Sequence, residues 1–165
     1  MTEFKVGEMA VYPGHGVAEV VKLSRREISG ATLEFYELRV IDNGMKVMVP
    51  RKNAANVGLR RIVTDEQILE VYEVLRRRDE KISTATWNRR HREYMDKIKT
   101  GSLSEIAKVM RDLCLLRCDK ELSFGERKML NTAQTLLVQE LALAKGIERD
   151  AMAAELDALF VKPKS

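Results

Sequence analysis

The chain has 165 residues, of which 45% are hydrophobic and 33% charged, with a formal net charge of +4 and a pI near 9.1. This composition indicates a soluble globular protein with one domain or two small ones. No apolar run approaches the ~20 residues that span a bilayer, and residues 1–5 lack the pattern of a signal peptide. We therefore expect a cytoplasmic protein with no membrane partner.

The first 63 residues have the pattern of an antiparallel β domain. Turn sequences at residues 13–16, 29–30 and 42–44 separate short runs rich in Val, Leu and Ile. The last of these turns holds an Asn-Gly pair between two apolar runs, which is a strong hairpin signal. Five short strands joined by tight turns predict a small, strongly bent barrel, with residues 57–62 as its closing strand.

From Thr64 onward the apolar residues recur with helical spacing. Three capping boxes are predicted, at residues 64–67, 102–105 and 123–126, and Asp150 is the expected cap of a last short helix. We expect a helix over 64–78, a loop over 79–86 and further helices to about residue 160. The fold class is therefore α+β with two domains: a β domain of residues 1–63 and an all-α helical domain of residues 64–165.

The motifs of catalysis and metal binding are absent from the sequence. The two histidines and two cysteines lack the spacing of a zinc site, and there is no nucleophile elbow, P-loop or dinucleotide fingerprint. We predict a protein that is not an enzyme and that uses no metal or cofactor. Cys114 and Cys118, one helical turn apart, are interpreted as small core residues.

The excess positive charge is concentrated in residues 76–99, which carry nine Lys/Arg and four Asp/Glu. In a helix of this segment, Trp87, Met95 and neighbouring apolar residues would form one stripe with basic residues beside it. Two interpretations remain open. The stripe is either core with a solvated basic edge, or an exposed apolar wedge for the DNA minor groove, surrounded by side chains that bind phosphates. Phe124, close to Arg127, allows the same two interpretations.

Several of these segments resemble the CarD/CdnL family of bacterial transcription factors. Phe-Lys-Val-Gly-Glu at residues 4–8 and Val-Tyr-Pro-Gly-His-Gly-Val at residues 11–17 resemble its N-terminal signature, which the transcription-repair coupling factor shares. Trp-Asn-Arg-Arg at residues 87–90 and Leu-Ser-Phe-Gly-Glu-Arg-Lys-Met-Leu at residues 122–130 resemble its C-terminal half. The resemblance continues in order from about residue 4 to residue 160, which is typical of a stand-alone CdnL-type protein.

The resemblance implies a Tudor-like or SH3-like N-terminal barrel that binds the β subunit of RNA polymerase through one sheet edge. It implies polymerase contacts at Arg26, Leu38, Val40, Met48 and Pro50. Met48 stands where some relatives carry arginine, which favours an apolar contact there.

For the helical domain, the resemblance implies a role on promoter DNA at the upstream edge of the transcription bubble. Trp87 matches the family's wedge residue. The other implied DNA-binding residues are the basic Arg89, Arg90, Arg92 and Arg127 and the apolar Met95 and Phe124. The implied function is stabilisation of open promoter complexes, including those at ribosomal RNA promoters, by a monomer.

Two other functions stay open from the sequence. A free-standing, non-specific DNA-binding protein would bind DNA without polymerase, with an affinity that falls steeply with salt. A protein-interaction module without a DNA role would be insensitive to the replacement of Trp87.

Overall fold

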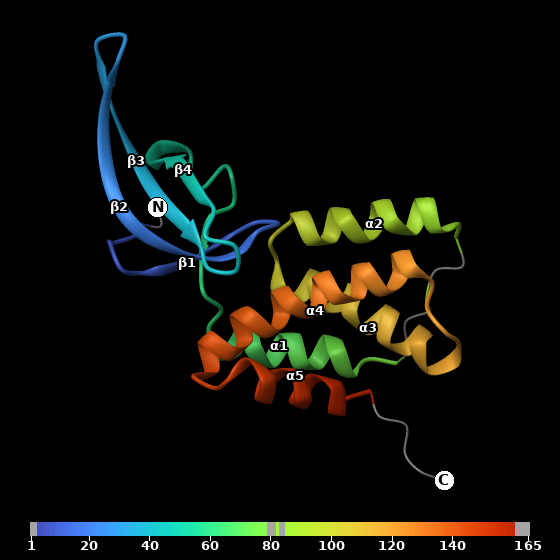
Figure 1. The fold of residues 1–165 in the computed structure, drawn as a ribbon. Helices are drawn as coiled ribbons and strands as arrows, with labels where there is room; N and C mark the ends of the chain where they lie inside the picture. Colours follow the sequence, from blue (N-terminus) through green and yellow to red (C-terminus); the bar gives the residue numbers. More distant parts are fainter. Residues whose placement is uncertain (1–2, 79–81, 83–84, 161–165) are drawn as a thin grey trace. The chain divides into compact units, whose positions relative to one another are not determined.

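The computed structural model describes residues 3–78, 82 and 85–160. It divides into two compact units, Met1–Ile62 and Val63–Ser165, and Figure 1 shows the first as a β-sheet and the second as a group of helices. The predicted α+β fold of two domains is confirmed. Most of the loop predicted over residues 79–86 lies outside the described residues.

The N-terminal unit is one antiparallel sheet of strand order β4-β3-β2-β1-β5. Its elements are β1 (Met9–Tyr12), β2 (Gly16–Ile28), β3 (Ala31–Val40), β4 (Lys46–Pro50), the 3-10 helix η1 (Arg51–Asn53) and β5 (Arg60–Arg61). Ser29 and Gly30, with φ of 51° and 80°, join β2 to β3. Two central residues with positive φ make the tight turn whose twist matches a hairpin, so β2 and β3 extend together as a long arm (Figure 1).

The strands differ in length from the sequence expectation in two places. β2 continues to Ile28, five residues beyond the apolar run 17–23, because the outer half of the arm is exposed and carries no hydrophobic pattern. β5 has only two residues instead of the expected six. A register shift between Val20 and Lys22 interrupts the β2–β3 pairing, and such bulges increase the bend of a sheet.

The helical unit contains five helices in its described residues. They are α1 (Asp65–Arg76), α2 (Trp87–Lys99), α3 (Leu103–Asp119), α4 (Phe124–Lys145) and α5 (Arg149–Ala158). All five contribute to one apolar core, in which Met110 and Leu113 of α3, Leu137 and Leu141 of α4 and Leu156 of α5 are completely buried. None of the helices among the described residues is long and apolar enough to cross a membrane.

Two of the three predicted capping boxes are complete. Thr64 and Ser123 each accept a hydrogen bond from the third helical residue, whose side chain accepts one in return. At α3 the box is half made: Ser102 caps the Glu105 N–H, but the N–H of Ser102 donates to the Thr100 hydroxyl instead. The prediction for Asp150 is wrong, because Glu148 is the N-cap and α5 begins at Arg149, so Asp150 lies inside the first turn of the helix.

Candidate functional site

The first turns of α2 and α4 lie against each other in the helical unit, and both begin at the same end of it (Figure 1). Trp87 is the first residue of α2 and Gly125 the second of α4. A Cβ atom added to Gly125 would lie 2.9 Å from Nε1 of Trp87 and 3.1 Å from Cε2 and Cζ2 of the same ring. The indole therefore rests on the α4 backbone, where only glycine leaves room for it, and Trp87 is half-buried.

Arg90 lies one turn further along α2 and points into the same junction. Its Nη2 donates to Oε2 of Glu126 on α4 at 2.6 Å, and the two side chains are only 10% and 5% exposed. Its guanidinium carbon lies 5.2 Å from the centre of the Trp87 ring and 6.0 Å from that of Tyr94. The expectation that Arg90 flanks the stripe at its solvated edge is wrong, because Glu126 of another helix pairs with it inside the junction.

Glu126 is held in place by the cap of its own helix. Its Oε1 accepts from the Ser123 N–H at 3.0 Å, while the Ser123 hydroxyl accepts from the Glu126 N–H at 3.2 Å. Burial by itself would raise the pKa of Glu126, but the two Ser123 bonds and the charge of Arg90 hold that pKa below its ordinary value. Glu126 is therefore ionised at neutral pH, and both of its oxygens have partners.

The remaining DNA-binding candidates are mostly exposed. Phe124, directly before Gly125, is 75% exposed, which decides between its two interpretations: it is not packed down. Tyr94 and Ile98 are core, whereas Met95 is half-buried against that core. The stripe of α2 is thus buried in part and open in part, and the exposed basic candidates around it are Arg89, Arg92 and Arg127.

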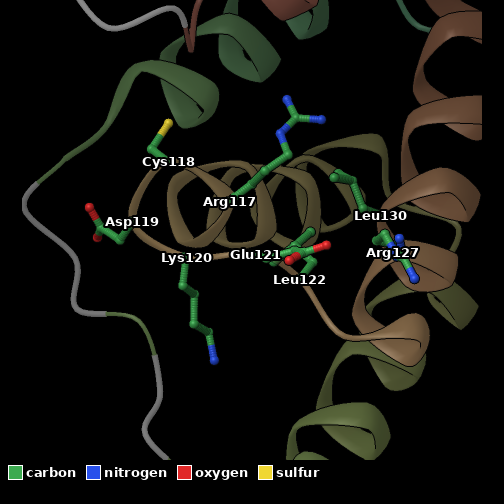
Figure 2. Close-up of a pocket in the computed structure, with 8 residues that line it drawn as sticks. All are labelled: Arg117, Cys118, Asp119, Lys120, Glu121, Leu122, Arg127 and Leu130. Carbon is green, nitrogen blue, oxygen red and sulfur yellow. The ribbon is translucent and has the colours of Figure 1, made fainter.

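A pocket of about 430 Å³ lies where α3 ends and α4 begins, and Arg127 is part of its wall. Figure 2 shows the side chains of Arg117 and Lys120 pointing to opposite sides of α3, so these two cations do not converge on one point. Asp119 and Glu121 add negative charge to the same wall. The pocket therefore lacks the arrangement of a dedicated anion site.

The polymerase-binding candidates of the N-terminal unit fall into two groups. Arg26 is exposed and Met48 is 37% exposed, and Nη2 of Arg26 lies 3.6 Å from Sδ of Met48. Met48 and the half-buried Pro50 belong to β4, an edge strand of the sheet. These three residues share one accessible region.

Leu38 and Val40, in contrast, are at most 1% exposed and belong to the core of the N-terminal unit. Their side chains cannot contact a partner. Side chains alternate along a strand, and Glu37 and Arg39, which stand opposite Met48 and Lys46 of β4, lie on the other face. The alternation of side chains over residues 37–40 was the sequence signal that could have shown that Leu38 and Val40 face the core.

A second surface feature of this unit, a pocket, was not predicted from the sequence. A pocket of about 280 Å³ lies beside Pro50, between the start of β3 and η1, and Leu33 forms part of its wall. Its residues come from segments that are 16 or more positions apart, so only the folded sheet brings them together. The full lining is Thr32, Leu33, Glu34, Pro50, Arg51 and Lys52.

Comparison with known proteins covers both units. The family profile described as the CarD C-terminal domain matches residues 70–157, and the CarD-like/TRCF RID domain matches residues 4–63. YdeB, a candidate transcription factor of Bacillus subtilis (strain 168), is 33% identical over 144 residues, which cover 87% of this chain and 94% of YdeB. This chain belongs to the CarD family. CarD-like proteins are transcription factors and are not known as enzymes.

Two solved structures of CarD-family domains are also similar. CdnLNt from Myxococcus xanthus is 45% identical and covers 39% of this chain and 92% of its own, with a TM-score of 0.33. The 72-residue N-terminal domain of Myxococcus xanthus CarD is 34% identical and covers 36% of this chain and 79% of its own, with a TM-score of 0.31. Among the described residues of this CarD-family chain, no group of three His, Cys, Asp or Glu side chains could hold a metal ion.

Proposed function

We propose that this CarD-family chain regulates transcription initiation by binding the RNA polymerase β subunit and promoter DNA at once. The N-terminal unit holds the polymerase, and the helical unit holds the upstream edge of the transcription bubble. The result is a longer-lived open complex, including at ribosomal RNA promoters. The observation that carries this proposal is the junction of α2 and α4, where a seated Trp87 and an exposed Phe124 lie among exposed arginines.

The chemistry of this junction suits a distorted DNA fork better than a protein partner. Exposed arginines neutralise phosphates and release counterions, and apolar side chains enter the minor groove between base steps and hinder restacking. Trp87, Met95 and Phe124 supply the apolar part. Arg89, Arg92 and Arg127 supply the charges, which position the protein without reading a sequence.

The edge strand β4 is the proposed polymerase contact. An edge strand offers unpaired backbone groups that a partner strand can bind. Arg26, Met48 and Pro50 are the side chains beside it that a partner can reach. Leu38 and Val40 support this surface from the core side only.

Attachment to polymerase explains how a modest DNA contact suffices. Once the N-terminal unit is bound, the helical unit meets the fork as a tethered partner at a high effective concentration. A gain of only about 1.4 kcal/mol shifts the open-complex equilibrium about tenfold. We therefore expect weak DNA binding by the free chain.

The test is the lifetime of open complexes formed by bacterial RNA polymerase on a ribosomal RNA promoter. The native chain should lengthen this lifetime, and Trp87→Ala and Phe124→Ala should lose most of the effect. Leu69→Ala is the matched control for Phe124→Ala, because Leu69 is also a strongly exposed apolar residue of the helical unit, at 70% against 75%. If the native chain binds polymerase but leaves the lifetime unchanged, it is an interaction module and the proposed DNA role is wrong.

The polymerase contact has a separate test. Met48→Glu places a charge on the β4 edge and should abolish co-purification with the β subunit, whereas Ile28→Glu at the exposed end of the β2–β3 arm should not. If the chain binds DNA without polymerase, and if neither variant changes polymerase function, the free-standing DNA-binding protein is favoured instead.

A further inference from the structure

The junction of α2 and α4 contains a buried basic residue that the proposed DNA contact does not need as a phosphate ligand. We propose that Arg90, Gly125 and Glu126 form a seat for the Trp87 indole, with Arg90 acting as a positioning residue and not as a phosphate contact. This inference rests on the proposed role of Trp87 at the DNA fork. The three residues are called the Trp87 seat below.

Charge and burial exclude Arg90 from the phosphate-binding surface. Its guanidinium is within 2.6 Å of the Glu126 carboxylate, and both side chains are at least nine-tenths buried. A phosphate would have to displace a carboxylate that Ser123 also holds. The ion pair has no net charge, so it adds little to the attraction of DNA, unlike the exposed Arg92.

The contacts of the indole account for the role of the seat. Gly125 lies against the Nε1 side of the ring, and the Arg90 guanidinium lies over the ring at 5.2 Å from its centre. The His91 ring meets it edge-on, with centroids 5.5 Å apart. A cation above an aromatic face is held by the ring's quadrupole. The indole is therefore fixed from two helices before DNA arrives.

A fixed indole matters because a wedge acts only while it stays inserted. A ring that changes rotamer easily would lose entropy on insertion and would leave the fork more readily. The seat removes this cost in the free protein. It also explains why a glycine stands in the first turn of α4, where a better helix former would otherwise be favoured.

The decisive variant is Gly125→Ala, which leaves every charge in place. The new methyl group would meet the indole at 2.9 Å, so Trp87 has to move. Trp87 is the only tryptophan of the chain, and its fluorescence reports on the seat directly. We expect a red-shifted emission and stronger acrylamide quenching for Gly125→Ala, with unchanged far-UV circular dichroism. Asn131→Ala, an exposed position later in α4, is the control that should leave emission and quenching as in the native chain.

The same variants are then compared in the open-complex assay. Gly125→Ala should lose the effect on lifetime to the same extent as Trp87→Ala, and Asn131→Ala should retain it. Unchanged fluorescence in Gly125→Ala overturns the seat, and so does shifted fluorescence with a native lifetime effect. If the native chain itself has no effect on lifetime, the proposed function fails, while the fluorescence still decides whether the seat fixes the indole.

The part of the inference that concerns Arg90 is tested by salt dependence. Binding of the full chain to a forked DNA is measured over a range of salt concentrations for Arg92→Ala and for the double variant Arg90→Met with Glu126→Gln, which removes Arg90 without leaving an unpaired buried charge. Loss of one phosphate contact reduces the slope of log K against log salt by about 0.9. We expect that reduction for Arg92→Ala only, whereas the double variant at Arg90 and Glu126 should weaken binding equally at every salt concentration. An equal loss of slope in both variants would make Arg90 a phosphate contact and contradict the proposal.

Discussion

Each unit of this CarD-family chain has an arginine that binds carboxylates, and the two arginines differ in their surroundings. In the N-terminal unit, Arg51 bonds Glu34 and Glu3, each at 2.5 Å, with side chains that are 37%, 27% and 65% exposed. In the helical unit, Arg90 bonds Glu126 at 2.6 Å, and both side chains are nearly inaccessible. The bond lengths are alike, so burial, not geometry, separates the two sites.

Burial changes what each ion pair does for the protein. Exposed pairs contribute little, because water and salt screen them. A buried pair gains little over an apolar one, yet removal of one partner leaves an uncompensated charge in a medium that cannot solvate it. Replacement of Arg51 should therefore cost little stability, whereas Arg90 and Glu126 can be replaced without a large loss of stability only when both are changed together. The predictions below test this difference, from the largest effect to the smallest.

The largest effect is expected from Glu126→Gln. The amide keeps an oxygen for the Ser123 N–H, so the capping box survives. Its NH2 group replaces the oxygen that accepts from Arg90, so the pair loses its hydrogen bond together with its charge. Stability should fall by about 3–5 kcal/mol, because Arg90 remains buried without its counter-charge. Urea denaturation followed by circular dichroism measures this loss as a lower midpoint at an unchanged m value.

A double variant separates two contributions to this loss of stability: the loss of the ion pair itself and the cost of leaving Arg90 buried without a counter-charge. Arg90→Met combined with Glu126→Gln removes both charges, so it should be more stable than Glu126→Gln alone. The double-mutant cycle reports the coupling between the two residues. If the double variant is the least stable of the set, the stranded charge is not what destabilises Glu126→Gln.

Acid should weaken the helical unit through the same carboxylate. The pKa of Glu126 is lower in the folded chain than its ordinary value of 4.5. Its contribution is therefore complete above pH 4.5 and is lost as the pH falls through the lower, folded pKa. Urea midpoints measured between pH 7 and pH 3 should fall more steeply for the native chain than for Glu126→Gln. Parallel curves would mean that other carboxylates cause the acid sensitivity.

A smaller effect is expected from the residue that supports Glu126. Ser123→Ala removes one bond of a complete capping box and should cost about 1 kcal/mol. It should also increase the acrylamide quenching of Trp87, because Glu126 and then Arg90 lose part of their restraint. Ser102→Ala is the control: Ser102 also caps a helix, but it is remote in sequence from the Trp87 seat and should leave the fluorescence unchanged.

Local sequence signals predicted the elements of both units well, because turns and caps depend on neighbouring residues. The Ser29-Gly30 turn, the Asn43-Gly44 turn and the boxes of Thr64 and Ser123 all form as expected. The site was less predictable. The periodicity of α2 places Arg90 beside the stripe but cannot show that Glu126 lies across from it, 36 residues away.

The resemblance had a similar limit in the N-terminal unit. It indicated a segment of β3 but not which of its side chains face the core. Leu38 and Val40 were therefore assigned to a surface, although they fill the core. Strand alternation would have corrected this assignment, since a partner can reach only every second residue of a strand packed on one face. The sequence therefore left two things open: which residue pairs with Arg90 in the folded chain, and which face of β3 carries Leu38.

The smallest effect is expected at the exposed counterpart of the buried pair. Arg51→Gln removes the cation between Glu34 and Glu3, and the Arg51 charge is what mainly lowers the pKa of Glu34, through their hydrogen bond. Both carboxylates stay accessible to water, so no stranded charge results and the urea midpoint at 0.5 M salt should match that of the native chain. At low salt a small loss should become measurable, because screening then weakens. A large loss at high salt would show that accessibility to water does not decide the cost of breaking an ion pair in this chain. The contrast between Arg51 and Arg90 would then have to come from the rings and the helix cap around Arg90.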